Sequence, residues 1–300
     1  MDYRTLGKTG ERVSAIGIGG AHAARPSTQE ETSKIIRTAI DNGINFMDNC
    51  WDYSGGDAEV RMGKALRDGY RQRAFLMTKI DAHFASVATQ QIEQSLSRLQ
   101  TDVIDLLQIH EVIRMGDPER VFAPGGTMEA LLKARDAGKI RYIGFTGHKD
   151  PDIHLKMLSM DFPWDTVQMP LNCLDSTHRS FEAKVLPVLV ERGIGVLGMK
   201  PLASGAAVRE GVATAEECLR YAMSLPTSVV ITGCDSFEIA EQAIRVWKNF
   251  VPMTADEMSA LRARGNVPNR NGVLEGYKTT KRFDGTDNNP HWLTTASVTA

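Results

Sequence analysis

Residues 74–110 read AFLMTKIDAHFASVATQQIEQSLSRLQTDVIDLLQIH, and this stretch decides the fold. It begins and ends with apolar runs, 74–79 and 103–110, that are long enough for a strand and too short for a helix. Between them, three apolar residues recur at i, i+4 and i+7, namely Ile92, Leu96 and Leu99. That spacing places them on one face of a helix. The stretch therefore predicts a strand, a helix and a second strand in succession.

The same alternation continues through most of the chain. Eight short apolar runs are separated by amphipathic stretches, and they cover Ser14–Gly19, Ile44–Asp48, Ala74–Lys79, Val103–His110, Arg141–Thr146, Thr166–Pro170, Gly195–Lys200 and Ser228–Gly233. Helix start signals agree, since Ser27–Glu30 and Thr214–Glu217 both fit the capping box. Strands that alternate with helices pair in parallel, and eight such units close a barrel. We expect an α/β fold, a (β/α)8 TIM barrel, with an open doubly wound sheet as the alternative.

The two ends of the chain do not fit this alternation. Two short runs, Tyr3–Leu6 and Glu11–Ser14, flank a turn-forming segment, which predicts a β-hairpin over residues 1–15. After the barrel, which is expected over residues 16–250, strand signals stop.

Residues 251–300 are expected to hold one more helix and a tail. The helix starts at the capping box Thr254–Glu257, and the Gly-, Asn-, Asp- and Thr-rich remainder is expected to fold over the barrel. No low-complexity linker interrupts the sequence, so we expect a single domain over residues 1–300.

Composition disfavours several classes of function. The 300 residues carry a net charge of −2 with no basic block, whereas nucleic-acid binding needs a concentrated positive surface. No apolar run approaches the roughly 20 residues that span a bilayer. The four cysteines are far apart and form no C-x-x-C pair, which disfavours a structural zinc site or a disulfide framework. The polar N-terminus lacks a signal region, and a reducing cytoplasm is the expected compartment.

Polar side chains gather where the predicted strands end. Asp48, Lys79 and His110 end three consecutive strands. In a (β/α)8 barrel the active site lies at the carboxyl ends of the strands, so these three side chains share one rim. A single lysine or histidine at such a place is usually structural or solvated. An acid, an amine and an imidazole together favour a functional site.

Residues 45–63 read NFMDNCWDYSGGDAEVRMG, and they resemble the signature of the aldo-keto reductase superfamily. That signature has an Asp, a Tyr five residues later, and a Gly, a Glu and a second Gly that open the next helix. Further segments that resemble family segments are Phe75–Lys79, Ile104–His110, Gly138–Gly144 and Pro201–Gly205. The hairpin is similar to the plug of the family's barrel. The resemblance implies a nicotinamide-dependent carbonyl reductase.

The resemblance implies a role for each of four residues, Asp48, Tyr53, Lys79 and His110. Hydride transfer to a carbonyl leaves an alkoxide, so Tyr53 is expected to protonate the oxygen as general acid. A free tyrosine has a pKa of about 10, and a neighbouring ammonium favours the ionised phenol, so Lys79 is expected to lower the pKa of Tyr53. Asp48 is expected to keep Lys79 charged, and His110 to orient the carbonyl.

The resemblance also implies a cofactor, NADP(H) or NAD(H), that lies across the strand ends. A Rossmann fingerprint at Gly17–Gly19 is rejected, because His22 stands where the third glycine belongs. The residues expected to hold the cofactor are Gly19, Gly20, Asp48, Thr146, Gln168, Met199, Lys200, Pro201, Leu202, Ser204, Gly205, Gly233, Cys234, Asp235, Glu241 and Gln242.

Two segments depart from the family pattern. The family carries an Asn after the fifth strand, where this chain has Gly147, and Asn172 and His148 are the candidates to replace it. NADPH-preferring relatives carry a cation after the eighth strand, whereas Cys234–Glu238 holds two acidic residues and no positive charge. A 2′-phosphate is repelled there unless Arg245 or another cation intervenes, so both cofactors remain open.

The favoured function is hydride transfer between a nicotinamide cofactor and an aldehyde, a ketone or a sugar-like carbonyl. Trp51, His148 and Asn172 are expected to line the substrate pocket. The alternative is a cofactor-binding sensor or regulatory subunit with little turnover. A metal-dependent hydrolase ranks last, because no H-x-H pair is visible, and no metal is expected. The expected partner is a small carbonyl or alcohol, with no nucleic acid or membrane, and the sequence leaves the oligomeric state undetermined.

Overall fold

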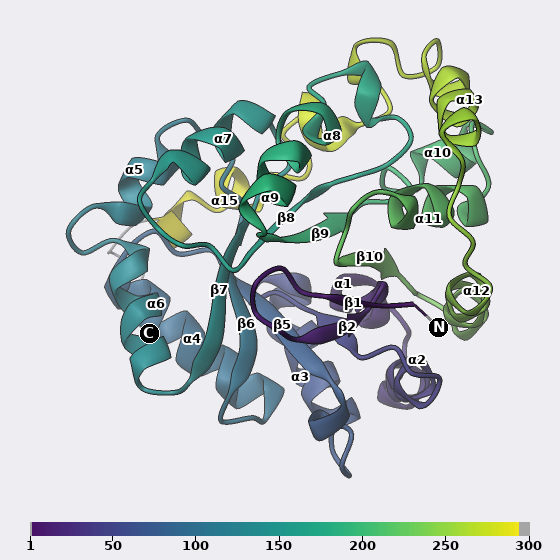
Figure 1. The fold of residues 1–300 in the computed structure, drawn as a ribbon. Helices are drawn as coiled ribbons and strands as arrows, with labels where there is room; N and C mark the ends of the chain where they lie inside the picture. Colours follow the sequence, from purple (N-terminus) through teal and green to yellow (C-terminus); the bar gives the residue numbers. More distant parts are fainter. Residues whose placement is uncertain (1, 294–300) are drawn as a thin grey trace.

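The computed structural model describes residues 2–293 and closes eight parallel strands into a barrel (Figure 1). The strands are β3 (Ile16–Gly19), β4 (Phe46–Asp48), β5 (Phe75–Ile80), β6 (Ile104–Ile109), β7 (Ile140–Thr146), β8 (Thr166–Pro170), β9 (Gly195–Met199) and β10 (Val229–Gly233). They neighbour one another in chain order, and β10 pairs with β3 to complete the circle. The predicted (β/α)8 barrel is confirmed, and the open-sheet alternative is wrong.

Helices occupy the connections between the strands, and one more, α12 (Phe237–Lys248), follows the last strand. The connecting helices are α1 (Gly20–Ala23), α2 (Gln29–Asp41), α3 (Asp57–Ala65), α4 (Ala85–Leu99), α5 (Asp117–Phe122), α6 (Thr127–Asp136), α7 (Pro151–Ser159), α8 (Phe181–Lys184), α9 (Leu186–Arg192), α10 (Ala206–Arg209) and α11 (Ala215–Ser224). The same connections contain the 3₁₀ turns η1 (Tyr53–Gly56), η2 (Arg71–Arg73) and η3 (Asp175–Thr177). On α4, the predicted apolar face of Ile92, Leu96 and Leu99 is buried against the barrel.

Side-chain caps fix where several helices begin. The predicted boxes at Thr214 and Thr254 are both present, and they start α11 and α13 (Ala255–Gly265). The box predicted at Ser27–Glu30 is wrong by one residue, because Thr28 caps α2 and Glu31 closes the box. Thr28 has the extended backbone that an N-cap needs, which aims its hydroxyl at the Glu31 backbone N–H.

The N-terminal hairpin closes the amino end of the barrel. Strands β1 (Tyr3–Thr5) and β2 (Arg12–Ser14) pair antiparallel, as predicted, and Figure 1 shows them in purple across the barrel end. Leu6, at the start of the turn, is fully buried among side chains of the barrel interior. Gly7 has a φ of +53°, and a Cβ there would lie 2.3 Å from the backbone N of Gly195. Only glycine permits so close an approach of the turn to β9.

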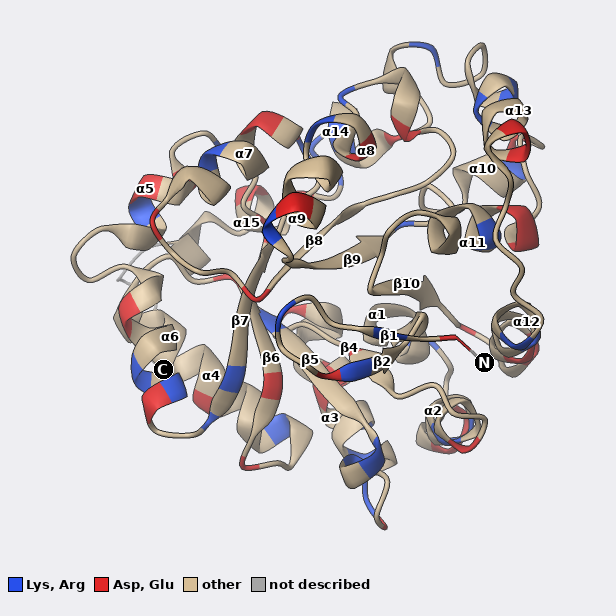
Figure 2. Ribbon diagram, viewed as in Figure 1, with Lys and Arg blue, Asp and Glu red and all other residues tan. Residues whose placement is uncertain are grey.

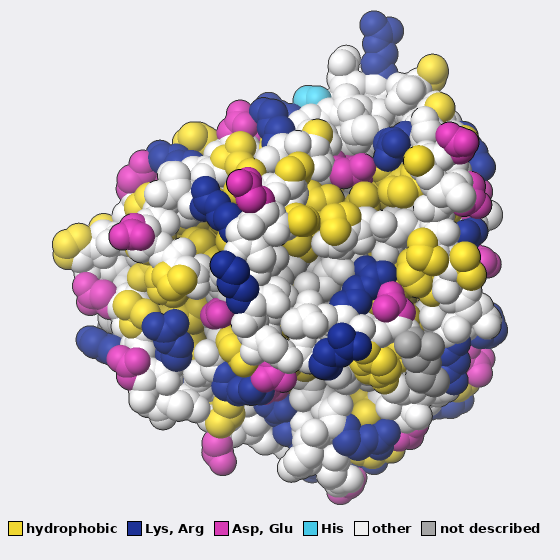
Figure 3. Space-filling view, in the orientation of Figure 1, with side chains coloured by type: hydrophobic (Ala, Val, Ile, Leu, Met, Phe, Trp, Pro, Cys, Tyr) yellow, Lys and Arg dark blue, Asp and Glu magenta, His cyan; other side chains and the backbone are white. Residues whose placement is uncertain are grey.

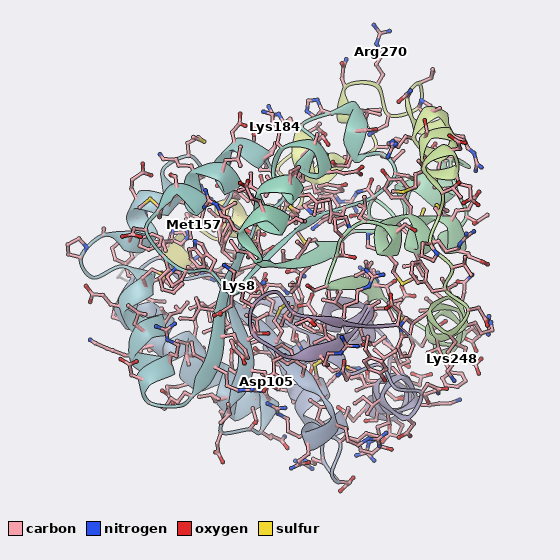
Figure 4. All side chains as sticks on the ribbon, viewed as in Figure 1. Lys8, Asp105, Met157, Lys184, Lys248 and Arg270 are labelled. Carbon is pink, nitrogen blue, oxygen red and sulfur yellow. The ribbon has the colours of Figure 1, made fainter. Side chains whose placement is uncertain are left out.

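An ion cluster beside the hairpin ties the amino ends of the strands together. Asp105 accepts hydrogen bonds from Arg71 and Arg141, at 2.8 Å each. Figure 4 shows Asp105 at this end of the barrel, with Lys8 of the hairpin turn near its centre. Cationic and acidic side chains are interspersed over this face (Figure 3). Because the active sites of such barrels lie at the opposite end, we interpret this cluster as a stability feature.

Residues 270–293 cross the carboxyl end of the barrel, and we call them the strap. The strap contains η4 (Arg270–Gly272), α14 (Gly276–Thr279), α15 (Gly285–Asn288) and η5 (Pro290–Leu293). In Figure 1 its yellow segments lie beside α7 and α8, away from the hairpin. The predicted tail over the barrel is thus present through residue 293, and residues 294–300 of that tail lie outside the described chain.

The surface carries charges of both signs. Figure 2 shows Lys and Arg mixed with Asp and Glu around the outer helices. Within residues 2–293, no helix combines the length and the apolar character that crossing a bilayer requires.

Candidate active site

Four predicted side chains meet at the carboxyl rim because their strands are neighbours. Asp48 ends β4, Lys79 lies on β5, His110 follows β6, and Tyr53 opens η1 after β4. The parallel register aligns Asp48 with Met77 and the end of β5 with the end of β6. The structure therefore brings the predicted tetrad together.

Lys79 is the centre of the tetrad. Its Nζ donates to a carboxylate oxygen of Asp48, to the carbonyl O of Asn49 at 2.6 Å, and to the phenol oxygen of Tyr53 at 3.3 Å. The other oxygen of Asp48 accepts from Gln168 Nε2 at 3.0 Å. Because Lys79 is only 1% exposed, its charge depends on these partners rather than on water.

The loop that carries Tyr53 has an unusual backbone. Ser54, Gly55 and Gly56 all have positive φ, at 54°, 64° and 95°. Gly56 has a φ of +95°, which strongly favours glycine, and the Arg98 guanidinium packs against it, 2.4 Å from where a Cβ would stand. Arg98 also donates to the Trp51 carbonyl at 2.9 Å, which ties the loop to α4. Sequence reasoning missed Arg98, because its place on the helix only becomes relevant once α4 packs against the loop.

Burial decides the acidity of Tyr53. Burial first, and then the charges of Asp48, Cys50, Asp52 and Asp81, raise the pKa of the Tyr53 phenol well above its usual value. Burial and these negative charges outweigh the lowering that was expected from Lys79, so the net shift of this pKa is upward. The Lys79 ammonium lies within hydrogen-bonding reach of the phenol, but it shares its charge with Asp48. Tyr53 therefore stays protonated at neutral pH.

A second group of side chains surrounds His110. Polar atoms of Cys50, Asp52, Asp81 and His110 all lie within 4.8 Å of one another. The shortest contact joins His110 Nδ1 to Asp81 Oδ1 at 2.7 Å. Sequence reasoning missed Asp81, although a signal was present: it stands two residues after Lys79, and side chains two apart on an extended strand share a face.

The predicted nicotinamide-binding residues lie beside the tetrad. In the barrel register Gly19 pairs with both Asp48 and Gly233, and Thr146 pairs with Gln168. Gln168 is buried, and its Oε1 has no hydrogen-bond partner in the described chain. A buried amide oxygen without a donor fits the NH₂ of a carboxamide.

Lys200 begins a strained loop on the next part of the rim. Lys200, Ala203, Ser204 and Gly205 all have positive φ, and three of these four are not glycine, which is rare within one loop. Burial lowers the pKa of Lys200 to about 8. Its Nζ contacts Met199 Sδ at 3.6 Å and forms no ion pair with a carboxylate of residues 2–293. An anionic group such as a pyrophosphate fits this site, and Met199, Pro201 and Leu202 flank it.

The segment after β10 has a cation that the sequence pattern did not reveal. Asp235 pairs with Arg25 at 3.4 Å and lies 3.7 Å from His22 Nδ1. Both partners come from α1 and the residues just after it, and this segment follows β3, which lies next to β10 in the closed barrel. Cys234 is fully buried.

The last two predicted cofactor residues lie farther along α12. Glu241 is exposed and Gln242 half-buried, and neither makes a hydrogen bond to the other predicted residues in the described chain.

The departure at Gly147 has a steric cause. A Cβ at this position would lie 2.3 Å from the Val112 carbonyl oxygen, so an Asn cannot stand there. Asn172 and His148, the two candidates to replace the family's Asn, already have hydrogen-bond partners in the strap. Asn172 donates to the Tyr277 phenol at 2.9 Å, and His148 Nε2 lies 3.1 Å from Asp284.

His148 and Asn172 therefore hold the strap. Burial lowers the pKa of His148 to about 4, so the ring is neutral and donates to Asp284. Trp51 lies on the rim, with its ring edge-on to Trp292 of the strap at a centroid distance of 5.5 Å. Its indole N–H donates to Gln94 at 2.6 Å, which leaves the ring face for packing.

Comparison with known proteins agrees with this geometry. The model of the Aldo/keto reductase family matches residues 15–211. An L-galactose dehydrogenase of Arabidopsis thaliana is 32% identical over 223 aligned positions, in a match that covers 70% of this chain and 68% of the relative. The aldo-keto reductase YhdN of Bacillus subtilis (strain 168) is 32% identical over 213 aligned positions, in a match that covers 66% of this chain and 61% of that protein.

Solved structures share the fold. The holo form of an aldo-keto reductase from Bacillus halodurans has a TM-score of 0.73 at 24% identity, covering 88% of this chain and 96% of that one. An aldo/keto reductase from Klebsiella pneumoniae, in complex with NADP and acetate, has a TM-score of 0.71 at 22% identity, covering 89% and 96%. With the family match over more than half of its length, this chain belongs to the aldo/keto reductase family.

Proposed function

We propose that this protein catalyses reversible hydride transfer between a nicotinamide cofactor and a small carbonyl compound, with Tyr53 as the proton donor. Family membership supports an NAD(P)H-dependent oxidoreductase in general. The observation that carries the finer proposal is the contact of Lys79 with both Asp48 and Tyr53 at one rim of the barrel.

In this proposal Tyr53 donates the proton and Lys79 stabilises the charge that remains on the phenol oxygen. Burial keeps the Tyr53 phenol protonated, because it raises the pKa of that group, and the protonated phenol is the form that donates. After the phenol gives its proton to the substrate oxygen, the negative charge rests on the Tyr53 oxygen, 3.3 Å from the Lys79 ammonium. Opposite charges this close, away from water, attract strongly, so Lys79 stabilises the state that follows proton transfer. Asp48 keeps Lys79 in place for the next cycle.

The other predicted residues divide into cofactor and substrate groups. A bound nicotinamide cofactor supplies the hydride. Gln168 offers a free amide oxygen, and Lys200 a cation without a carboxylate partner in the described chain. In this proposal the Asp235–Arg25 pair faces the 2′ position of the adenosine ribose, where the two dinucleotides differ. On the substrate side we propose His110 and Trp51, while Asn172 and His148 act indirectly through the strap.

A screen with both dinucleotides tests the proposal. Absorbance of the reduced nicotinamide is followed with a panel of aldehydes, ketones and aldose sugars, the last suggested by the L-galactose dehydrogenase relative. We expect turnover with at least one carbonyl class, and binding of a dinucleotide by titration calorimetry. Binding without turnover across the panel would favour the sensor or regulatory alternative, and absence of dinucleotide binding would refute both.

A further inference from the structure

His110 has a buried carboxylate partner, Asp81, which directly follows the neighbouring strand β5. Its Nδ1 lies 2.7 Å from Asp81 Oδ1, and both residues are buried, Asp81 completely. An ionised carboxylate accepts hydrogen bonds and cannot donate one, so beside ionised Asp81 the Nδ1 atom of His110 carries the proton. The Cys50 thiol, 3.2 Å from the same nitrogen, can direct its own hydrogen to Asp81 Oδ2 at 3.9 Å instead.

The barrel itself holds this pair in register. Ile80, the last residue of β5, pairs with Ile109 of β6, so the residues that follow them, Asp81 and His110, leave the sheet side by side. The backbone N–H of His110 donates to the Ile80 carbonyl at 2.8 Å. Backbone amides of Asp81 and Ala82 both donate to the Gln91 side chain of α4, which fixes the turn after β5. The contact is therefore part of the strand-end framework and does not depend on a mobile side chain.

Other groups also face the imidazole, but no other carboxylate of the described chain comes as close. Asp52 lies 3.9 Å from His110 Nδ1, on the loop after β4. Glu111 follows His110 in the chain, and its carboxylate accepts from the strap backbone N–H groups of Gly285 and Thr286 at 2.8 and 2.7 Å. Tyr53 stands edge-on to the ring at a centroid distance of 6.0 Å. The cation of the tetrad, Lys79, is bound to Asp48.

The tautomer has a chemical consequence at the other ring nitrogen. With the proton on Nδ1, a neutral imidazole presents only a lone pair at Nε2, which repels a carbonyl oxygen. The ring can donate from Nε2 only as the imidazolium, with both nitrogens protonated. A carboxylate at hydrogen-bonding distance favours that charged form.

We infer that Asp81 is a positioning residue that holds His110 as an imidazolium, so that Nε2–H faces the substrate oxygen. The inference rests on the proposed function for its catalytic meaning, but the Asp81–His110 pairing can be tested without turnover. Burial alone lowers the pKa of His110, but the Asp81 carboxylate outweighs it and the net pKa is raised. Burial also raises the pKa of Asp81, but the His110 charge and the hydrogen bond to the ring act against that rise, which favours the ionised carboxylate beside the imidazolium.

The sign of the pH dependence follows from these directions. The imidazolium is present below the raised pKa of His110 and is lost as the pH rises through it. The His110 charge, and with it the donor at Nε2, therefore declines as the solution becomes more alkaline. Removing the Asp81 charge moves this loss to lower pH.

Nuclear magnetic resonance of the ring nitrogens tests the pairing directly. The ¹⁵N shifts of His110, assigned by comparison with His110→Gln, are titrated in the wild type, in Asp81→Asn and in Asp52→Asn. The amide that Asp81→Asn introduces can still accept from Nδ1 but carries no charge. We expect the proton affinity of His110 to fall at least about tenfold in Asp81→Asn, and less than about threefold in Asp52→Asn, whose carboxylate makes no hydrogen bond to the ring. If Asp81→Asn does not fold, Asp81→Ser replaces it.

An unchanged His110 titration in the Asp81 variant would overturn the inference, as would an equal effect of Asp52→Asn. With an active enzyme, the alkaline limb of kcat/KM for carbonyl reduction should move to lower pH in Asp81→Asn, while dinucleotide affinity stays constant. A limb that does not move would also contradict the assignment. Failure to find any turnover refutes the proposed function but leaves the nitrogen titration to decide the pairing.

Discussion

In the proposed mechanism, single side chains determine where the proton and the compensating charge lie, and Lys79 is the clearest case. Its single ammonium donates hydrogen bonds to the Asp48 carboxylate, the Asn49 carbonyl and the Tyr53 phenol oxygen. This pairing explains why a lysine that is 1% exposed can stay charged, since each partner replaces water. The phenol, by contrast, is kept neutral by burial, which raises its pKa. The pair thus places a proton and a compensating charge in contact.

Under the proposed cofactor binding, dinucleotide preference depends on two single side chains, Arg25 and Asp235. Arg25→Ala removes the cation beside Asp235, and Asp235→Asn removes the acid that repels a 2′-phosphate. We expect the NADPH-to-NADH affinity ratio to fall about tenfold in the first variant and to rise by a similar factor in the second. Titration calorimetry with both dinucleotides measures the ratio, and Lys248→Ala, at the exposed end of α12 away from Asp235, is the control. The assignment fails if both variants keep the wild-type ratio.

The sequence predicted most of the tetrad from pattern, because Asp48, Lys79 and His110 each stand at the end of an apolar run. It did not predict Arg25 beside Asp235, since 210 residues separate them and only barrel closure brings β3 next to β10. Nor did it predict that Asn172 is bound to Tyr277, since nothing in the local pattern indicates the path of the strap.

At the scale of elements, the conformation of two loops positions candidate site residues. Three positive-φ residues follow Tyr53, and four occur in the Lys200–Gly205 loop, so both segments that carry the candidate site have constrained backbones. Such backbones cost free energy and persist only where the surroundings hold them. Arg98 holds the loop after Tyr53 in this conformation. Its guanidinium donates to the Trp51 carbonyl and packs against Gly56.

Two substitutions at the start of α2 test which residue is its N-cap. Thr28→Ala removes the hydroxyl that accepts from the Glu31 backbone N–H, so we expect the free energy of unfolding to fall by about 1 kcal/mol. Ser27→Ala, one residue earlier, removes only an exposed contact with the Glu31 carboxylate and should change it by less than about 0.5 kcal/mol. Denaturant unfolding measures both. If Ser27→Ala lowers the free energy of unfolding more than Thr28→Ala does, the N-cap of α2 is Ser27, as the sequence first predicted.

This one-residue error has a simple origin. Ser27 and Thr28 both satisfy the capping pattern, with Glu30 and Glu31 three residues later. Composition alone cannot separate them, because the choice depends on which residue has extended backbone as the chain enters α2. The boxes of α11 and α13 had no such competitor and were predicted correctly.

The whole molecule is organised as a barrel with two different ends. The hairpin and the Asp105 ion cluster close the amino end, while the strap crosses the carboxyl end beside the candidate active site. Eight alternations of strand and helix were enough to predict closure, since that number of parallel strands completes a barrel. The path of the strap was not predictable in detail, because its many polar contacts have no sequence period.

A substitution at Lys278 tests how much the buried ion pairs of the strap contribute to stability. Its ammonium is fully buried and pairs with Asp175 at 2.7 Å and Glu275 at 2.9 Å. Lys278→Met leaves both carboxylates buried without their cation, so we expect the free energy of unfolding to fall by about 3–5 kcal/mol. Lys281→Met, at a side chain that is 81% exposed, should cost less than about 0.5 kcal/mol. Equal thermal unfolding midpoints for the two variants would mean that the strap contributes little.

The proposed reaction depends most directly on the phenol of Tyr53, and Tyr53→Phe removes that oxygen while keeping the ring. With a carbonyl substrate from the screen and saturating dinucleotide, kcat should fall about 10²- to 10⁴-fold, the usual contribution of a general acid. Dinucleotide affinity should stay within about twofold of the wild type, because the phenol is not among the residues proposed to bind the cofactor. A Tyr53→Phe enzyme that reduces the carbonyl at the wild-type rate would contradict the assignment of Tyr53 as proton donor.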